Sequence, residues 1–236
     1  MIEDKENLER IKEYQTVIRK ILSAFEGVSF SLIVESSTGY KVWSVDKKRD
    51  ADLIDDISTI ARIITNRYYN TPITRDTYKS VIGKKPEAFR PNEVGRILEY
   101  EIYNAYEIYN TSKNFKVISK VQPLKQVGYP DIKIIEKTGK ICFLDIKATT
   151  RPDKGSPRDF YYSTKEKTLE KINSDGFHLL LGFIIKESNP EKFITIGWKL
   201  VDLSKIKVGL KAEFNADNLE IYKPEAIIKE EWVEEL

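Results

Sequence analysis

Two short stretches in the middle of the chain carry residue types that can hold a divalent cation. Asp131 opens one apolar run, and Asp145 and Lys147 lie at the end of the next one. Charged groups of this kind are costly to place in an apolar core. Carboxylate oxygens are hard ligands that suit Mg²⁺, and a lysine beside them can contact a phosphate or an attacking water. The three residues therefore indicate a Mg²⁺ site suited to hydrolysis.

A β-hairpin is expected to bring these side chains together. Residues 131–136 and 141–147 have the pattern of two strands, and Gly139 between them suits the positive φ of a tight turn. Successive side chains on a strand point to opposite faces, so Asp145 and Lys147 share a face. With the turn centred beside Gly139, the aspartate that opens the first strand lies opposite residue 146, give or take one position. The two carboxylates and the ammonium can then converge on one spot.

The composition excludes several other kinds of site. The only histidine, His178, lies in an apolar strand pattern, so a histidine-based triad or zinc site is not expected. No glycine-rich phosphate loop is present. The net charge of +2 does not by itself indicate a nucleic-acid partner, and any basic surface must be local. Chemistry in this chain must therefore use carboxylates, lysine and a metal ion.

Two further features bear on location. No run of about 18 apolar residues occurs, so no transmembrane helix and no membrane partner are expected, and the charged N-terminus lacks the apolar segment of a signal peptide. The single cysteine, Cys142, lies in the middle of an apolar strand, where a buried thiol is expected, and no disulfide can form within the chain. These observations predict a cytoplasmic protein.

Helical and strand patterns follow one another in mixed order. Apolar periodicity predicts helices at residues 2–25, 52–69, 92–109 and about 164–173, and strands at 30–34, 40–45, 131–136, 141–147, 177–185 and 193–201. Residues 70–89 are expected to be irregular. This order predicts an α/β fold with a central mixed β-sheet flanked by helices, and with a helix-rich N-terminal part.

The hairpin pattern resembles that of the PD-(D/E)XK nuclease superfamily. Tyr129-Pro130-Asp131, followed by Asp145-Ile146-Lys147 and two threonines, is similar to the core of the EcoRV-like branch of type II restriction endonucleases. The apolar run 178–185 is similar to the strand that follows in such enzymes, and the resemblance covers about residues 92–186. It implies a restriction-endonuclease-like fold and Mg²⁺-dependent, sequence-specific hydrolysis of phosphodiester bonds in double-stranded DNA. It also implies a homodimer, because a palindromic site presents one bond on each strand.

The resemblance assigns roles within the hairpin. Asp131, Asp145 and the backbone carbonyl of Ile146 would hold Mg²⁺, for which Mn²⁺ could substitute. Lys147 would orient the attacking water and stabilise the charge that develops on the phosphate. The family pattern adds a glutamate on an upstream helix, and Glu99 in residues 92–109 occupies the similar position.

A second glutamate on the same helix competes with Glu99. Glu101 also lies within an apolar stripe at helical spacing, so either side chain could face the hairpin. Either could equally be a solvated helix residue.

Two polar stretches at the ends of the hairpin are candidates for DNA contact. Residues 122–128 precede the first strand and residues 151–162 follow the second, and their side chains can bond base edges or phosphates. The candidates are Gln122, Lys125, Gln126, Arg151, Lys154 and Arg158. Ordinary polar loops are the alternative for both stretches.

The resemblance also suggests a division of the chain. Residues 1–90 would form an N-terminal helical and hairpin region for dimerisation or DNA contact, and residues 91–236 the nuclease core with its recognition loops. Other functions compatible with the pattern are a junction resolvase or repair nuclease, or a non-catalytic DNA-binding module on the same fold. A further alternative is a structural hairpin in which Asp145 and Lys147 merely form an ion pair.

Overall fold

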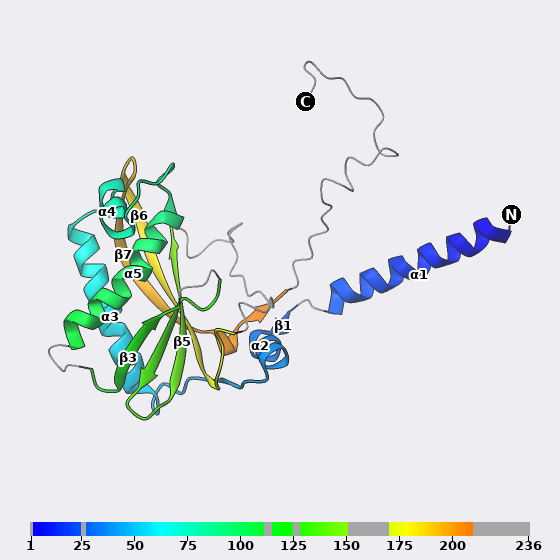
Figure 1. Ribbon diagram of the computed structural model, residues 1–236, viewed down its shortest axis with the longest axis horizontal. Coiled ribbons are helices and arrows are strands. Elements are labelled where there is room, and N and C mark those ends of the chain that lie inside the picture. Colours follow the sequence, from blue (N-terminus) through cyan, green and yellow to red (C-terminus); the bar gives the residue numbers. More distant parts are fainter. Residues whose placement is uncertain (1, 25–26, 111–114, 125–127, 151–169, 210–236) are drawn as a thin grey trace, which may run out of the picture. The chain divides into compact units, whose positions relative to one another are not determined.

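The computed structural model describes residues 2–24, 27–110, 115–124, 128–150 and 170–209. These residues belong to two units, one made of residues 1–27 with 208–236 and the other of residues 28–207. In the first unit, α1 (Ile2–Ala24) forms the helix that its apolar periodicity predicts (Figure 1). Of the helix expected at about residues 164–173, only residues 170–173 are described, and they are not helical.

A six-stranded mixed sheet forms the centre of the second unit. Its strands are β2 (Val42–Trp43), β3 (Ile118–Pro123), β4 (Ile132–Glu136), β5 (Ile141–Thr149), β6 (Gly176–Asn189) and β7 (Lys192–Asp202). The hydrogen-bonded order is β2-β6-β5-β4-β3, and β7 also pairs with β6. β5 and β6 are parallel, whereas β4 is antiparallel to β5 and β7 is antiparallel to β6. A separate two-stranded ladder joins β1 (Val28–Ser29) to β8 (Lys207–Val208), which follows the short 3-10 helix η1 (Leu203–Lys205).

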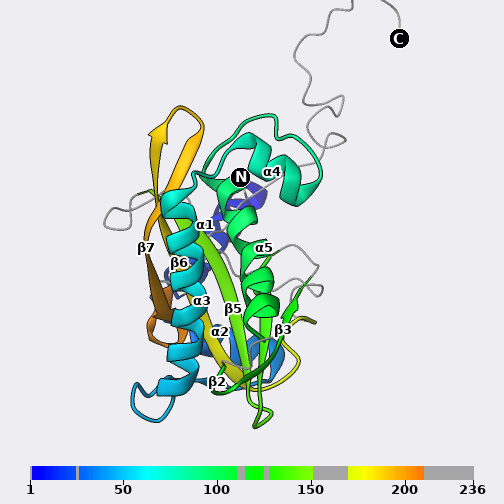
Figure 2. The same cartoon turned by 90° about the vertical axis from the view of Figure 1, so that its left-hand side faces the viewer.

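Helices cover both faces of this sheet. α3 (Ala51–Asn70) and α5 (Pro91–Asn110) lie on one face, and α2 (Phe30–Thr38) lies on the other (Figure 1). α4 (Arg75–Ile82) packs beside the N-terminal end of α5 (Figure 2). The predicted α/β class, with helices flanking a central mixed sheet, is confirmed.

The two faces of β5 bury different side chains. Cys142 and its neighbours at every second position belong to the large apolar core beneath α3 and α5. Phe143, on the opposite face, packs against the ring of His178, with 4.9 Å between the ring centroids. Phe30 of α2 contacts the same histidine ring. β5 is therefore buried on both sides along most of its length, and only its C-terminal end reaches solvent.

The prediction of two strands at residues 30–34 and 40–45 is wrong for the first strand. Residues 30–34 belong to α2, because Phe30 and Val34 are both buried and share one face at helical spacing. The helix ends at Gly39, whose φ of 78° is left-handed and whose N–H donates to the carbonyl of Glu35. The second predicted strand is reduced to the two residues of β2.

Two elements of the second unit were not expected from the sequence. α4 occupies part of the segment predicted to be irregular, and it begins at Thr74 with a capping box in which Thr74 and Thr77 bond each other's backbone N–H. β3 extends the sheet by pairing with β4, although it lacks a long apolar alternation. Short elements such as these depend on pairing and capping partners more than on periodicity.

Candidate active site

The β4–β5 register places Asp131 against the middle of β5. Ile132 pairs with Leu144, so the chain just before β4 reaches Asp145, within one position of the register expected from the turn. The N–H of Asp131 donates to the Leu144 carbonyl at 3.2 Å, and its Oδ2 accepts from the N–H of Ile146 at 2.8 Å. Backbone contacts therefore hold the Asp131 carboxylate beside β5.

Asp145 and Lys147 form an ion pair next to it. Nζ of Lys147 lies 2.8 Å from Oδ2 of Asp145, whose side chain is only 1% exposed, whereas that of Lys147 is 47% exposed. Despite this short distance, no well-directed hydrogen bond to a described residue satisfies Oδ2 of Asp145. The lysine can therefore reach solvent while the carboxylate beneath it stays buried.

The electrostatics of Asp145 favour an additional positive charge. The pKa of Asp145 is raised to about 7, mainly by burial and also by the charge of Asp131, while Lys147 acts in the opposite direction. A buried carboxyl that is paired with a second carboxyl and is incompletely hydrogen-bonded has the character of a cation ligand. Mg²⁺ is commonly bound by one or two carboxylates together with water and phosphate oxygens, so these residues fit that ion.

Glu99 also lies in the electrostatic neighbourhood of the hairpin. The pKa of Glu99 is raised to about 7, mainly by burial and also by the charge of Asp131, while Arg96, Lys147 and Lys171 act in the opposite direction. Among the described residues, however, no three His, Cys, Asp or Glu side chains are close enough to form a complete metal-binding cluster. Glu99 is therefore near the aspartates without joining them in one such cluster.

The rival glutamate has a different partner. Glu101 is buried, and its Oε2 accepts a hydrogen bond at 2.6 Å from Nη1 of Arg67 on α3. This ion pair ties α5 to α3 on the helical side of the sheet. The structure thus brings Glu99, and not Glu101, towards the hairpin, and a role for Glu99 in metal binding stays a prediction.

α5 is positioned by its contact with β5. A Cβ atom added to Gly95 would lie 3.8 Å from Cβ of Ala148, so the helix crosses β5 closely, one residue beyond Lys147. Glu99 lies one turn further along α5. On the outer side of the helix, Arg96 donates to the hydroxyl of Tyr78 on α4 at 2.8 Å.

A lysine that the sequence did not single out lies beneath the site. Lys171 is buried, and its Nζ donates to the carbonyl of Gly128 and, at 2.9 Å, to that of Pro130. Burial lowers the pKa of Lys171, while the charges of Asp131, Asp145 and Glu99 oppose that shift. Lys171 lies 40 residues after Asp131 and outside any motif, so the sequence does not predict this contact. The contact forms only in the folded chain.

Tyr129, two positions before Asp131, is held by a contact with His178. The hydroxyl of Tyr129 is bonded to Nδ1 of His178 at 2.7 Å, and burial lowers the pKa of His178 to about 3. The histidine is thus a neutral core residue, as its apolar surroundings predict. Its contact with Tyr129 helps to fix the segment that leads into Asp131.

The structure describes only one of the six residues predicted to contact DNA. Gln122 was expected in a loop, but it lies in β3, where it pairs with Lys133, because the strand continues to Pro123. The other candidates lie outside the described residues; they are Lys125, Gln126, Arg151, Lys154 and Arg158.

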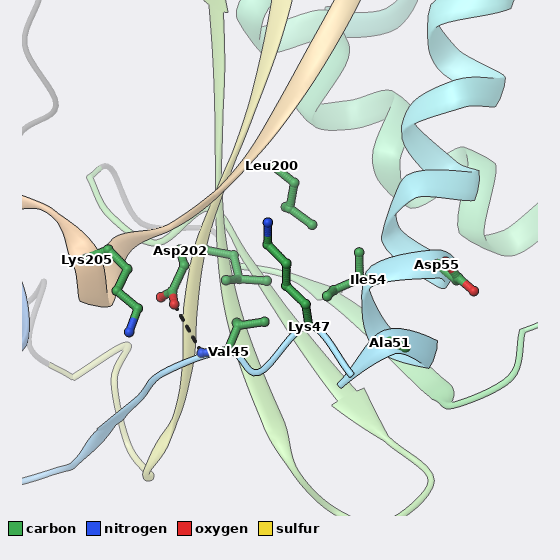
Figure 3. Close-up of a pocket in the computed structure, with 9 residues that line it drawn as sticks. Val45, Lys47, Ala51, Ile54, Asp55, Leu200, Asp202 and Lys205 are labelled. Atoms are coloured by element: carbon green, nitrogen blue, oxygen red, sulfur yellow. Dashed lines mark hydrogen bonds between the residues drawn. The ribbon is translucent and has the colours of Figure 1, made fainter. Parts of the chain in front are cut away.

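A pocket of about 500 Å³ lies away from the aspartates. It is lined by residues from the start of α3 and from the segments around β6 and β7, among them Ile54, Leu200 and Lys205 (Figure 3). Asp202 in its wall accepts a hydrogen bond from the N–H of Val45 at 3.1 Å. The lining residue Leu200 packs against the apolar core, so the pocket lies on the opposite face of the sheet from Lys147.

No helix in the described part of the chain is long and apolar enough to cross a membrane.

Comparison with known proteins identifies the family. The profile of the type II restriction enzyme MjaV family matches residues 23–225. The type II restriction enzyme MjaV of Methanocaldococcus jannaschii is 33% identical to this chain over 228 residues, which cover 93% of this chain and 95% of that enzyme. The match extends well beyond the hairpin, through both the helices and the sheet. The chain therefore belongs to the type II restriction enzyme MjaV family.

Proposed function

We propose that the protein is a Mg²⁺-dependent type II restriction endonuclease of the PD-(D/E)XK superfamily, similar to its EcoRV-like branch. The observation that carries this proposal is the convergence of Asp131, Asp145 and Lys147 on one hairpin of a chain from a restriction enzyme family. The substrate would be double-stranded DNA, cut at a specific sequence by a homodimer.

The hairpin residues would have separate roles in hydrolysis. Asp131, Asp145 and the Ile146 carbonyl would hold Mg²⁺, with Mn²⁺ able to substitute, and the ion would supply positive charge at the phosphate. Lys147 reaches solvent above the buried carboxylate, so its ammonium can orient a water molecule and bind a phosphate oxygen. The water oxygen forms a new bond to phosphorus, the bond to the departing sugar oxygen breaks, and that oxygen takes up a proton.

The charge of Glu99 would support the same site from α5. Its pKa is raised to about 7, mainly by burial, so additional positive charge at the site would favour its ionised form. Once ionised, it can bind a water molecule of the metal's hydration shell or a second ion.

Plasmid cleavage tests this function directly. Purified protein with plasmid and Mg²⁺ should give discrete fragments, and excess chelator should abolish them. Asp131→Ala, Asp145→Asn and Lys147→Ala should each lower the cleavage rate by about 10²-fold or more. Glu136→Gln, which changes a buried carboxyl at the turn end of the same hairpin, and Lys192→Ala on β7 are matched controls that should cleave normally. Normal cleavage by Lys147→Ala, or cleavage in chelator, would rule out this mechanism.

A further inference from the structure

The sheet face that carries Asp145 and Lys147 is closed at one end and open at the other. At the closed end, Phe143 on β5 pairs with His178 on β6, and both side chains are fully buried. Two rows further along, Lys147 pairs with Gly182, and here Lys147 is exposed and Gly182 is partly exposed. Among the residues that the structure describes, the cover on this face therefore ends at the candidate active site.

The open row continues onto β7. Gly182 pairs with Lys199, whose side chain is exposed, and directly paired residues on adjacent strands project from the same face. The flanking residues of β7, Trp198 and Leu200, pack against the apolar core on the other face, which confirms the direction of Lys199. β5, β6 and β7 are neighbouring strands (Figure 1). Lys147, Gly182 and Lys199 thus form one row across them, here called the Lys147–Lys199 row.

This row has the form of a shallow floor between two ammonium groups. Adjacent strands are about 4.8 Å apart, so the two lysine backbones are separated by about 10 Å. Gly182 has no side chain to fill the space between them. In the next row, Ile184 pairs with Gly197, and its Cδ1 would lie 3.7 Å from a Cβ atom at residue 197, so the Ile184 side chain borders the floor on that side.

The chemistry of the row fits a phosphodiester backbone. Lys147 contacts Asp145, whereas Lys199 makes no ion pair with any of the described residues. A flexible lysine with a free ammonium group can bind a phosphate without reading the base sequence. We propose that Lys199 binds a phosphate of the DNA backbone that flanks the scissile phosphate, with the backbone lying over Gly182. This inference rests on the proposed nuclease function and adds a substrate contact to it.

Binding measurements separate the inference from the function itself. The probe is a short fluorescent duplex of mixed sequence, titrated with full-length protein over a range of salt concentrations without Mg²⁺. Loss of one phosphate contact should reduce the slope of log affinity against log salt by about 0.9, which corresponds to about eightfold weaker binding at 0.1 M salt. Lys199→Ala should show this change, and Lys199→Arg should bind as the wild type does.

Two further variants complete the test. Lys192→Ala removes an exposed lysine from the same strand and should retain wild-type binding. Gly182→Val places a β-favourable side chain on the floor and should weaken binding without unfolding the protein. Equal affinity and salt slope for Lys199→Ala and Lys192→Ala, in a protein whose wild type binds and cuts DNA, would overturn the inference. A wild type that neither binds nor cuts DNA would instead overturn the proposed function.

Discussion

The carboxyl group of Asp145 lies in surroundings that oppose its ionisation. Its pKa is raised to about 7, mainly by burial, whereas an aspartate in an unfolded chain has a pKa of about 3.9. Between these two values the folded protein binds more protons than the unfolded chain. The free energy of unfolding contributed by this group is therefore present below pH of about 4 and is lost as the pH rises towards about 7.

Substitution of Asp145 should reveal this linkage. In chelator, we expect the melting temperature of the wild type to fall across this pH range, and Asp145→Asn to flatten the fall because asparagine cannot ionise. In a chain of this size, about 1 kcal/mol corresponds to 2–4 °C. Thermal unfolding at several pH values measures the effect, with Glu136→Gln as the control that leaves Asp145 in place. Mg²⁺ should raise the melting temperature of the wild type most at the higher pH, and an unchanged pH slope in Asp145→Asn would contradict this account.

Lys171 should be important for both stability and cleavage. Lys171→Met keeps the apolar stem but removes the donor to the Gly128 and Pro130 carbonyls, and a buried acceptor left unsatisfied costs about 1–3 kcal/mol. Chemical denaturation should show that loss, and cleavage should decrease because the segment leading to Asp131 is no longer held. The control is Lys133→Met, which removes an exposed hydrogen bond to Asn173 and a cation–π contact with Phe143 but leaves the segment before Asp131 in place. A denaturation midpoint equal to that of the wild type would show that Lys171 does not anchor this segment.

At the scale of the elements, the start of β6 depends on the absence of a side chain at Gly176. A Cβ atom there would lie 2.8 Å from the Ile141 carbonyl oxygen, which is backbone and cannot move aside easily. β6 enters the sheet at this point, where Gly176 also donates to the carbonyl of Lys41 at 3.1 Å.

We therefore expect Gly176→Ala to destabilise the protein by about 1–3 kcal/mol, as overpacking does elsewhere. Gly197→Ala is the matched control, since its Cβ would meet no atom closer than 3.7 Å, an ordinary contact. Chemical denaturation compares the two variants. Equal midpoints for both would mean that the sheet can adjust around residue 176.

The sequence predicted long elements and failed at short ones for physical reasons. α3, α5, β6 and β7 carry enough apolar residues for their period to be read, and the hairpin register followed from the single turn at Gly139. α2 has only nine residues, too few for its period to be distinguished from a strand, and β3 takes its structure from pairing with β4. Elements that depend on distant partners leave little local pattern in the sequence.

The same distinction applies to the candidate site. Asp131 directly precedes β4, Asp145 and Lys147 lie on β5, and a tight turn joins the two strands, so spacing alone could bring the three residues together. The choice between Glu99 and Glu101 depended on the rotation of α5, which the Arg67 contact reveals and the apolar stripes did not. Lys171 and Lys199 are close to the site only through the parallel β5–β6 crossover and the β6–β7 pairing.

At the scale of the whole molecule, the proposed function requires two active sites for one duplex. We expect a homodimer with twice the chain mass of 27.4 kDa, measurable by light scattering. Co-expression of wild-type and Asp145→Asn chains should yield mixed dimers that cut one strand and convert supercoiled plasmid into open circles. Wild-type dimers should give linear product. If the mixture only diluted the linear product, without accumulation of open circles, the expected mixed dimer with one working site would be contradicted.

The burial of Cys142 provides this protein with an internal reporter. It is the only cysteine of the chain, it is completely buried, and it lies on β5 three residues before Asp145, with Ile134 and Phe177 as its cross-strand neighbours. Burial also raises the pKa of its thiol, which keeps the reactive thiolate scarce. A thiol reagent can therefore label the protein only when β5 separates from the elements packed against it. The labelling rate would measure how often this part of the core opens, and whether added Mg²⁺ or DNA slows that opening.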